Sequence, residues 1–255
     1  MTEIILPPLA MDPDTEILRL AQRHDAAGGF GIQLLNILGA QVDGLIDRLP
    51  RDVQDQLGQA TQMALVQALS VASRSRDLVP DQAPWMNRVV SSAMGAAGGF
   101  GGLPTALAEL PLTTAMLLRV IEGVAVEHGF DPKADSVRFD CVQVFSAAGP
   151  LAHDDGADFG FMSARTALSG AALQALITRV APRLAAAMGQ KLAAQTVPVL
   201  GAAAGAATNY AYVNYYTDIA HVHFGLRRLA IEADIPPDEA VERLRSALSV
   251  PRKSR

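Results

Sequence analysis

One acid-rich loop contains side chains that could bind a divalent metal ion. His153, Asp154, Asp155 and Asp158 place one imidazole and three carboxylates within six residues, which are the nitrogen and oxygen donors that such ions bind. The spacing is not that of an EF-hand, because no glutamate closes a loop of about 12 residues. Asp154 and Asp155 could instead lie at the start of the next helix, where the helix dipole favours negative charge. Metal binding and helix capping are therefore alternative interpretations of this loop.

A second candidate is the segment around Asp218, His221 and His223. Asp218 and His221 are three residues apart and share one face of a helix, whereas His221 and His223 point about 200° apart and cannot both ligate one ion. The sequence predicts that Asp218 and His221 form either a buried hydrogen bond or half of a metal site that His128 or His153 completes. The candidate ligands of a metal-dependent hydrolase are His153, Asp154, Asp155, Asp218 and His221.

Tyrosines gather in one short segment. All four tyrosines of the chain lie within residues 210–216, directly after an Ala/Gly block and Asn209. Tyrosine suits the mouth of a pocket or a membrane interface, where one end of the ring is apolar and the other is wet, but it equally suits a seam between helices. Both interpretations stay open. The candidate ligand-binding residues are Gly201, Gly205, Asn209, Tyr212 and Tyr216.

The sequence lacks the nucleophile and phosphate-binding motifs that mark many enzymes. No Gly-x-Ser-x-Gly nucleophile motif occurs, and the glycine tract at 98–102 lacks the Gly-Lys-Ser/Thr of a phosphate loop. The single cysteine, Cys141, lies in an apolar run, which predicts a buried and inert thiol. The sequence therefore identifies no catalytic residue and no cofactor.

The composition favours closely packed helices. The chain has 255 residues, of which 44 are Ala and 21 are Gly, and only 18% are charged. The net charge of −5 supplies no basic field for nucleic acid, so a nucleic-acid partner is not expected. The N-terminus lacks the basic and apolar regions of a signal peptide, which predicts a cytoplasmic protein, with a peripheral position at the inner membrane as an option.

Residues that start and end helices recur along the chain, and the sustained alternation of β-branched residues that is typical of strands is missing. We therefore expect an all-α fold. The predicted fold is a multi-helix bundle with Ala/Gly-rich, closely packed central helices. Asp12-Pro13 should start the first helix and Gly28-Gly29 should end it. Helices 32–49 and 53–73 should follow and pair antiparallel. A short apolar helix should end at the glycines of 95–102. The remaining predicted helices are 110–128, ended by Gly129, then 134–148, 163–190 with a bend near Pro182, and a last helix after Pro236. The predicted domains are an N-terminal helical layer at 1–79, a helical domain at 80–248 and a short basic tail at 249–255.

Two stretches, 89–108 and 192–217, contain no charged residue. Each is long enough to cross a bilayer, but Gly, Pro and Asn replace the Leu, Ile and Phe that drive insertion, so we do not expect spanning helices. Gly95 and Gly99, like Gly201 and Gly205, have the Gly-x-x-x-Gly spacing that lets two helices approach closely. Packing in the core and a surface that faces lipid or a partner are both compatible with this spacing.

Several of these residues form blocks that are similar to the EcsC protein family. The blocks are Leu110-Pro111-Leu112-Thr113-Thr114, followed by a helix with Arg119 that ends at Gly129, then Val197-Pro198-Val199-Leu200-Gly201 with Gly205-Ala206 and Asn209, and the stretch from Tyr215 to Arg228. The resemblance covers about residues 80–248. It implies an α-helical bacterial protein with a membrane or transporter connection, and it supplies no catalytic residue.

Three functional hypotheses follow from the sequence. The first is a non-enzymatic helical protein that associates peripherally with a membrane or binds a lipid or another apolar small molecule through its Ala/Gly-rich helices and tyrosines. The second is the metal-dependent hydrolase. The third is a self-associating structural protein, a homo-oligomer whose Ala/Gly face makes the contact.

Overall fold

The chain forms an all-α fold, as the sequence predicts. The computed structural model describes residues 12–37, 51–78, 84–100, 102–145, 173–182, 185 and 201–249, and the regular elements in these ranges are all helices. The named helices are α1 (Pro13–Ile37), α2 (Arg51–Leu78), α3 (Pro84–Phe100), α4 (Gly102–Glu127), α5 (Asp135–Phe145), α8 (Gly201–Glu232) and α9 (Pro237–Ser249). A further helical stretch covers 173–182.

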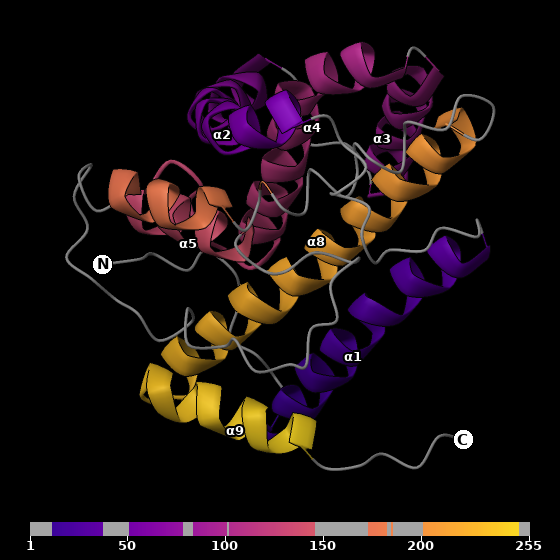
Figure 1. The fold of residues 1–255 in the computed structure, drawn as a ribbon. Coiled ribbons are helices and arrows are strands. Elements are labelled where there is room, and N and C mark those ends of the chain that lie inside the picture. Colours follow the sequence, from indigo (N-terminus) through magenta and orange to yellow (C-terminus); the bar gives the residue numbers. More distant parts are fainter. Residues whose placement is uncertain are drawn as a thin grey trace.

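Helix α8 is the centre of the arrangement. It runs diagonally through the molecule in Figure 1 and contacts α1, α3, α4, α5 and α9, while α2 packs on α4. The larger core cluster joins α4, α5 and α8 with parts of α2 and the stretch 173–182. A smaller cluster joins α1, α8 and α9. Because both clusters contain residues of α8, this helix must be positioned before either core is complete.

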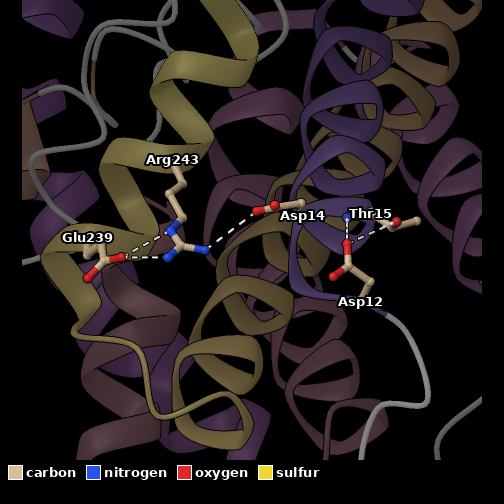
Figure 2. Close-up of polar contacts among 5 residues, drawn as sticks. All are labelled: Asp12, Asp14, Thr15, Glu239 and Arg243. Atoms are coloured by element: carbon tan, nitrogen blue, oxygen red, sulfur yellow. Dashed lines mark hydrogen bonds and ion pairs between the residues drawn. The ribbon is translucent and has the colours of Figure 1, made fainter.

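Local capping signals are correct at several helix ends. The Asp12 carboxylate accepts a hydrogen bond from the backbone N–H of Thr15 at 3.1 Å, and Pro13 is the first residue of α1 (Figure 2). Gly129 has a φ of 85°, a left-handed conformation that suits glycine. The N–H groups of Phe130 and Gly129 donate to the carbonyls of Ala125 and Val126, which is a Schellman closure of α4.

Helix α9 closes one end of the molecule. It begins at Pro237, directly after Pro236 as predicted, and its buried residues include Val241 and Leu244. The Arg243 guanidinium donates to Glu239 within α9 and reaches Asp14 of α1 at 3.5 Å (Figure 2). The pair with Asp14 lies at the surface and adds little stability, so the apolar cluster of α1, α8 and α9 determines where α9 packs.

Three predicted helix boundaries were wrong. Helix α1 continues through Gly28-Gly29, α3 continues through the glycines up to Phe100, and α4 begins at Gly102 with Pro111 inside it. Each glycine in a helix costs about 1 kcal/mol and an internal proline about 3 kcal/mol. Contacts of α1 and α3 with α8, and of α4 with α2, α3 and α8, offset these costs. Tertiary packing therefore overrides the local signal at these three places.

Of the other sequence predictions, one matches the structure and several fall on residues that it does not describe. The predicted helix 134–148 corresponds to α5. The predicted antiparallel pair of 32–49 and 53–73 stays a prediction, because 38–49 lie outside the described residues; of the described helices, α2 packs on α4 and α1 packs on α8. Residues 38–50, most of 163–190 and the tail after Ser249 lie outside the described residues. The domain division at residue 79 stays a prediction.

The two Gly-x-x-x-Gly segments meet each other between α3 and α8. A Cβ atom placed on Gly95 would lie 2.1 Å from the backbone oxygen of Gly205 and 2.8 Å from Cγ of Asn209. The amide of Asn209 donates a 2.8 Å hydrogen bond to the carbonyl of Ser91. One turn further on, Arg88 donates to Asn214 at 3.4 Å. Rising numbers on α3 meet falling numbers on α8, so the two helices run antiparallel along this seam.

This close contact predicts opposite effects for two glycine-to-alanine changes. Gly95→Ala should lower the free energy of unfolding by about 3 kcal/mol, because the new methyl group would clash with backbone rather than with a movable side chain. Gly58→Ala, in α2, should raise it by about 0.5 to 1 kcal/mol, because nothing lies within 4 Å of that Cβ position and alanine favours helix. Urea denaturation followed by circular dichroism measures both. Equal effects of the two changes would contradict the backbone contact at Gly95.

Candidate functional site

The predicted ligand-binding residues lie on one face of α8, and that face is turned inward. Gly205 and Asn209 lie in the seam with α3, while the side chains of Tyr212 and Tyr216 are fully buried. The Tyr216 ring stacks on Phe145 of α5 with 4.8 Å between ring centroids. Gly201 begins α8, and its surroundings are outside the described part. The structure thus gives Gly205, Asn209, Tyr212 and Tyr216 a packing role, and ligand binding at these residues stays a prediction.

Burial also determines the protonation of these tyrosines. Burial, together with the nearby Tyr215, raises the pKa of Tyr212 above its ordinary value, and burial followed by the neighbouring Tyr212 and Tyr215 raises the pKa of Tyr216. Both phenols therefore stay neutral at physiological pH. A neutral, buried phenol packs like an aromatic core residue and is not available as a base.

The outer face of α3 is apolar and exposed. Val89 and Val90 are 56% and 42% exposed, and Ala93 and Ala97 are exposed one and two turns further along. The opposite face contains the buried residues Ser91 and Gly95, which pack on α8. Arg88 is the single charged residue in the sequence of α3, and the first half of α8, residues 201–217, has none. Arg88 is thus the one charged residue that the sequences of α3 and of residues 201–217 contribute to this seam.

Several ion pairs lie on α1, α5, α9 and the second half of α8. Arg23 of α1 donates to Asp218 of α8 at 2.8 Å, and Arg228 pairs with Glu232 at 2.7 Å. Arg227 pairs with Asp140 of α5 and lies over the ring of Phe130, 4.6 Å from its centroid. Of these helices, α9 lies at the opposite end of α8 from α3 (Figure 1).

Two histidines meet where α4 ends against α8. The Nε2 atom of His128 lies 3.0 Å from Nδ1 of His221, and Nε2 of His221 lies 3.6 Å from a carboxylate oxygen of Glu127. Burial, followed by Arg228, Arg19 and Arg23, lowers the pKa of His128 to about 4. Burial, followed by Arg23, His128 and Arg19, lowers the pKa of His221 to about 3. Both imidazoles are therefore neutral at physiological pH and share one hydrogen bond.

The predicted metal ligands Asp218 and His221 contact other residues instead of each other. Asp218 bonds to Arg23, and His221 meets His128 instead of Asp218. His223 faces α5, where its Nε2 lies 3.6 Å from Asp140, which confirms that His221 and His223 point in different directions. In the described ranges, no three His, Cys, Asp or Glu side chains converge as metal ligands. His153, Asp154 and Asp155 lie outside those ranges, so the loop site stays a prediction.

Asp140 is the centre of a second charged cluster, which sequence reasoning did not single out. Burial alone would raise the pKa of Asp140, but His223 and Arg227 outweigh that effect and lower it overall. The Arg227 guanidinium also lies 3.4 Å from the hydroxyl of Ser136. The available signal was Asp140 itself, a charge between Phe139 and Cys141 in an apolar helix. Its partner Arg227 is 87 positions away, and no local pattern indicates that pairing.

None of the described helices is both long and apolar enough to cross a membrane.

The Asp140 cluster predicts a pH-dependent contribution to stability. At pH 7, Asp140→Asn should lower the free energy of unfolding by about 3 kcal/mol, because it leaves the mostly buried Arg227 without its carboxylate. A carboxyl group whose folded pKa is lowered contributes stability above its ordinary pKa of about 3.9 and loses it as the pH falls. The difference between wild type and variant should therefore shrink at pH 3. Urea denaturation at both pH values measures it.

A matched control for this test lies on the same helix. Asp135 is mostly exposed and lies 4.0 Å from Arg138, so Asp135→Asn should change the free energy of unfolding by less than about 0.5 kcal/mol. An Asp140→Asn effect that is equally large at pH 3 and pH 7 would contradict the ionised pair.

Comparison with known proteins identifies a family. The model of the EcsC protein family matches residues 74–229, whereas the sequence resemblance predicted about 80–248. The match begins in the last turns of α2 and ends in α8, and it contains the Gly95–Gly205 contact, the histidine pair and the Asp140 cluster. No curated protein and no solved structure matches the chain. Because the matched segment is more than half of the sequence, the chain belongs to the EcsC protein family.

Proposed function

We propose that this EcsC family protein associates peripherally with a lipid bilayer through the outer face of α3. The observation that supports the proposal is the division of α3 into two faces. One face packs tightly on α8, and the other, formed by Val89, Val90, Ala93 and Ala97, is apolar and exposed. A continuous exposed apolar face is uncommon on a folded protein and often marks a contact with a membrane or a partner.

The form of this face suits the interfacial zone of a bilayer. Val89, Ala93 and Ala97 are spaced four residues apart and make one stripe along the helix, with Val90 beside it. Arg88 lies next to the stripe, partly exposed, and donates to Asn214. Arginine near a bilayer keeps its aliphatic part among apolar groups and its guanidinium at the level of the phosphates. Such a helix lies in the plane of the interface with its apolar face toward the acyl chains.

The charge distribution supports apolar insertion over electrostatic attraction. The whole chain carries a net charge of −5, which anionic lipids would repel, and α3 has no basic cluster that would attract them. Among the described residues, ion pairs lie on α1, α9 and the second half of α8, away from the Val89 and Val90 face. Binding should therefore depend on the buried apolar area and should change little with salt. The family resemblance also implies a membrane connection, which supports a peripheral association.

Vesicle flotation tests the proposal. The full chain should float with phosphatidylcholine vesicles and equally with matched vesicles that contain phosphatidylglycerol. The double change Val89→Glu and Val90→Glu should reduce the bound fraction at least about tenfold, because it removes two apolar contacts and adds two charges that disfavour the apolar zone. Ile231→Glu is the control, since Ile231 is exposed to nearly the same extent as Val90, 41% against 42%, but lies at the charged end of α8.

Two results would overturn the membrane proposal. One is wild-type protein that stays with the unbound fraction for both kinds of vesicle. The other is loss of flotation in Ile231→Glu to the same extent as in the double variant. The remaining explanation is that the α3 face binds a second copy of the chain. Light scattering on the same samples tests this, because the wild type would then be a dimer and the double variant a monomer.

A further inference from the structure

We propose that two copies of this chain associate through the outer face of α2, with the two helices antiparallel about a two-fold axis at Met63. The α2 face consists of Gln59, Met63, Val66, Gln67 and Val71. Met63, Val66 and Val71 are 60%, 43% and 49% exposed, and both glutamines are exposed as well. This inference is independent of the membrane proposal, because that proposal uses a different helix, α3.

Helix α2 has two different sides. On its inner side, Leu65 and Leu69 are buried in the larger core cluster, and the helix packs on α4. On its flank, the amide of Gln62 donates a 3.3 Å hydrogen bond to the hydroxyl of Thr178. In Figure 1, α2 lies at the edge of the molecule beside α4. The α2 face is therefore on the side of the helix that the protein's own core does not use.

The composition of the α2 face favours a protein partner. Residues 56–73 contain no charged side chain, whereas α9 has five charged residues among its 13. The solvent side of a surface helix is ordinarily charged or polar, and methionine is enriched while charge is depleted at the centre of protein interfaces. Glutamine amides both donate and accept, so they can bond to each other across such an interface. Among acyl chains the same amides would have no partners, which disfavours lipid as the occupant.

The sequence of α2 is complementary to itself about Met63. A two-fold axis at Met63 places each position before it opposite the position equally far after it in the second copy. Gln59 then lies opposite Gln67, and Met63 lies opposite Met63. Asp52 and Arg74 are eleven positions before and after Met63. Eleven residues make about three turns, so both positions share the angular position of Met63, and the axis brings Asp52 of each copy opposite Arg74 of the other.

The charges at the two ends of α2 favour the antiparallel arrangement. Residues 51–55 contain one arginine and two aspartates, whereas residues 74–78 contain two arginines and one aspartate. Antiparallel contact brings the net negative end of one helix to the net positive end of the other, while parallel contact would bring like ends together. Within one helix, positions 52 and 74 are about 33 Å apart, which is several screening lengths. These two charges can therefore pair with each other only between copies.

Analytical ultracentrifugation of the full chain tests the proposal. A contact along one helix is at the small end of specific interfaces, so the wild type should show a monomer–dimer equilibrium with a dissociation constant in the micromolar range. Met63→Lys should weaken the dimer at least about tenfold, because it removes apolar contact and places two like charges at the axis. Leu18→Lys is the matched control and should dimerise like the wild type, since Leu18 is 50% exposed but lies on α1.

Charge reversal tests the antiparallel pairing. Asp52→Arg and Arg74→Asp should each weaken the dimer about fivefold, because both opposed pairs then have like charges. A mixture of the two single variants should regain the affinity of the wild type, since each opposed pair in the mixed dimer again has one positive and one negative member. Met63→Cys should form a disulfide-linked dimer in air, because the two copies meet at the axis. The wild type should not, because its one cysteine, Cys141, is buried.

Several results would overturn the assignment. They are a wild type that stays monomeric at about 200 µM, a dimer that Met63→Lys leaves intact, or a mixture of the charge variants that fails to associate. The double variant Val89→Glu and Val90→Glu should keep the dimer, so its dissociation would assign the contact to α3 instead. Circular dichroism of every variant reports whether it is folded. If Met63→Lys does not fold, the mixture still decides, because its two members differ from the wild type only near the ends of α2.

Discussion

The contact of two helix backbones at Gly95 and Gly205 is the constraint on which the remaining structure depends. A side chain at Gly95 would collide with the carbonyl of Gly205, so α3 and α8 can lie this close only because none is present. Asn209 completes the contact by bonding to Ser91. Once α3 is fixed in this way, its opposite face must point outward, and the exposed valines follow from the same packing that buries the glycines.

Helix α8 also has different partners on different faces. One face meets α3 near Gly205 and α5 near Tyr216 and His223, and another meets α1 and the end of α4. Since residues two apart on a helix point in very different directions, His221 joins His128 while His223 lies beside Asp140. Two polar clusters can therefore exist next to each other in the sequence without sharing a member. The apolar seam extends along the same helix and contains neither cluster.

Sequence patterns predicted those parts of the fold that local chemistry determines. The Asp12-Pro13 start, the Gly129 stop and the start of α9 after Pro236 depend on residues within one or two turns. The continuation of α3 through its glycines could not be predicted, because its cause is a helix about 100 residues away. The same holds for the candidate site. The Asp218 and His221 positions were identified, but Arg23, 195 positions from Asp218, takes the carboxylate that the sequence suggested for His221.

The late position of α8 in the sequence has a consequence for synthesis of the chain. Helices α1 and α3 leave the ribosome early, but their partner begins only at Gly201. Contacts between such distant segments form slowly, because a long loop must close before they contribute. The apolar face of α1 therefore stays uncovered while more than half of the chain is translated, and the glycine face of α3 stays uncovered while residues 101–200 are translated. A nascent protein of this kind has a long interval in which chaperones or neighbouring chains can reach surfaces that the finished fold conceals.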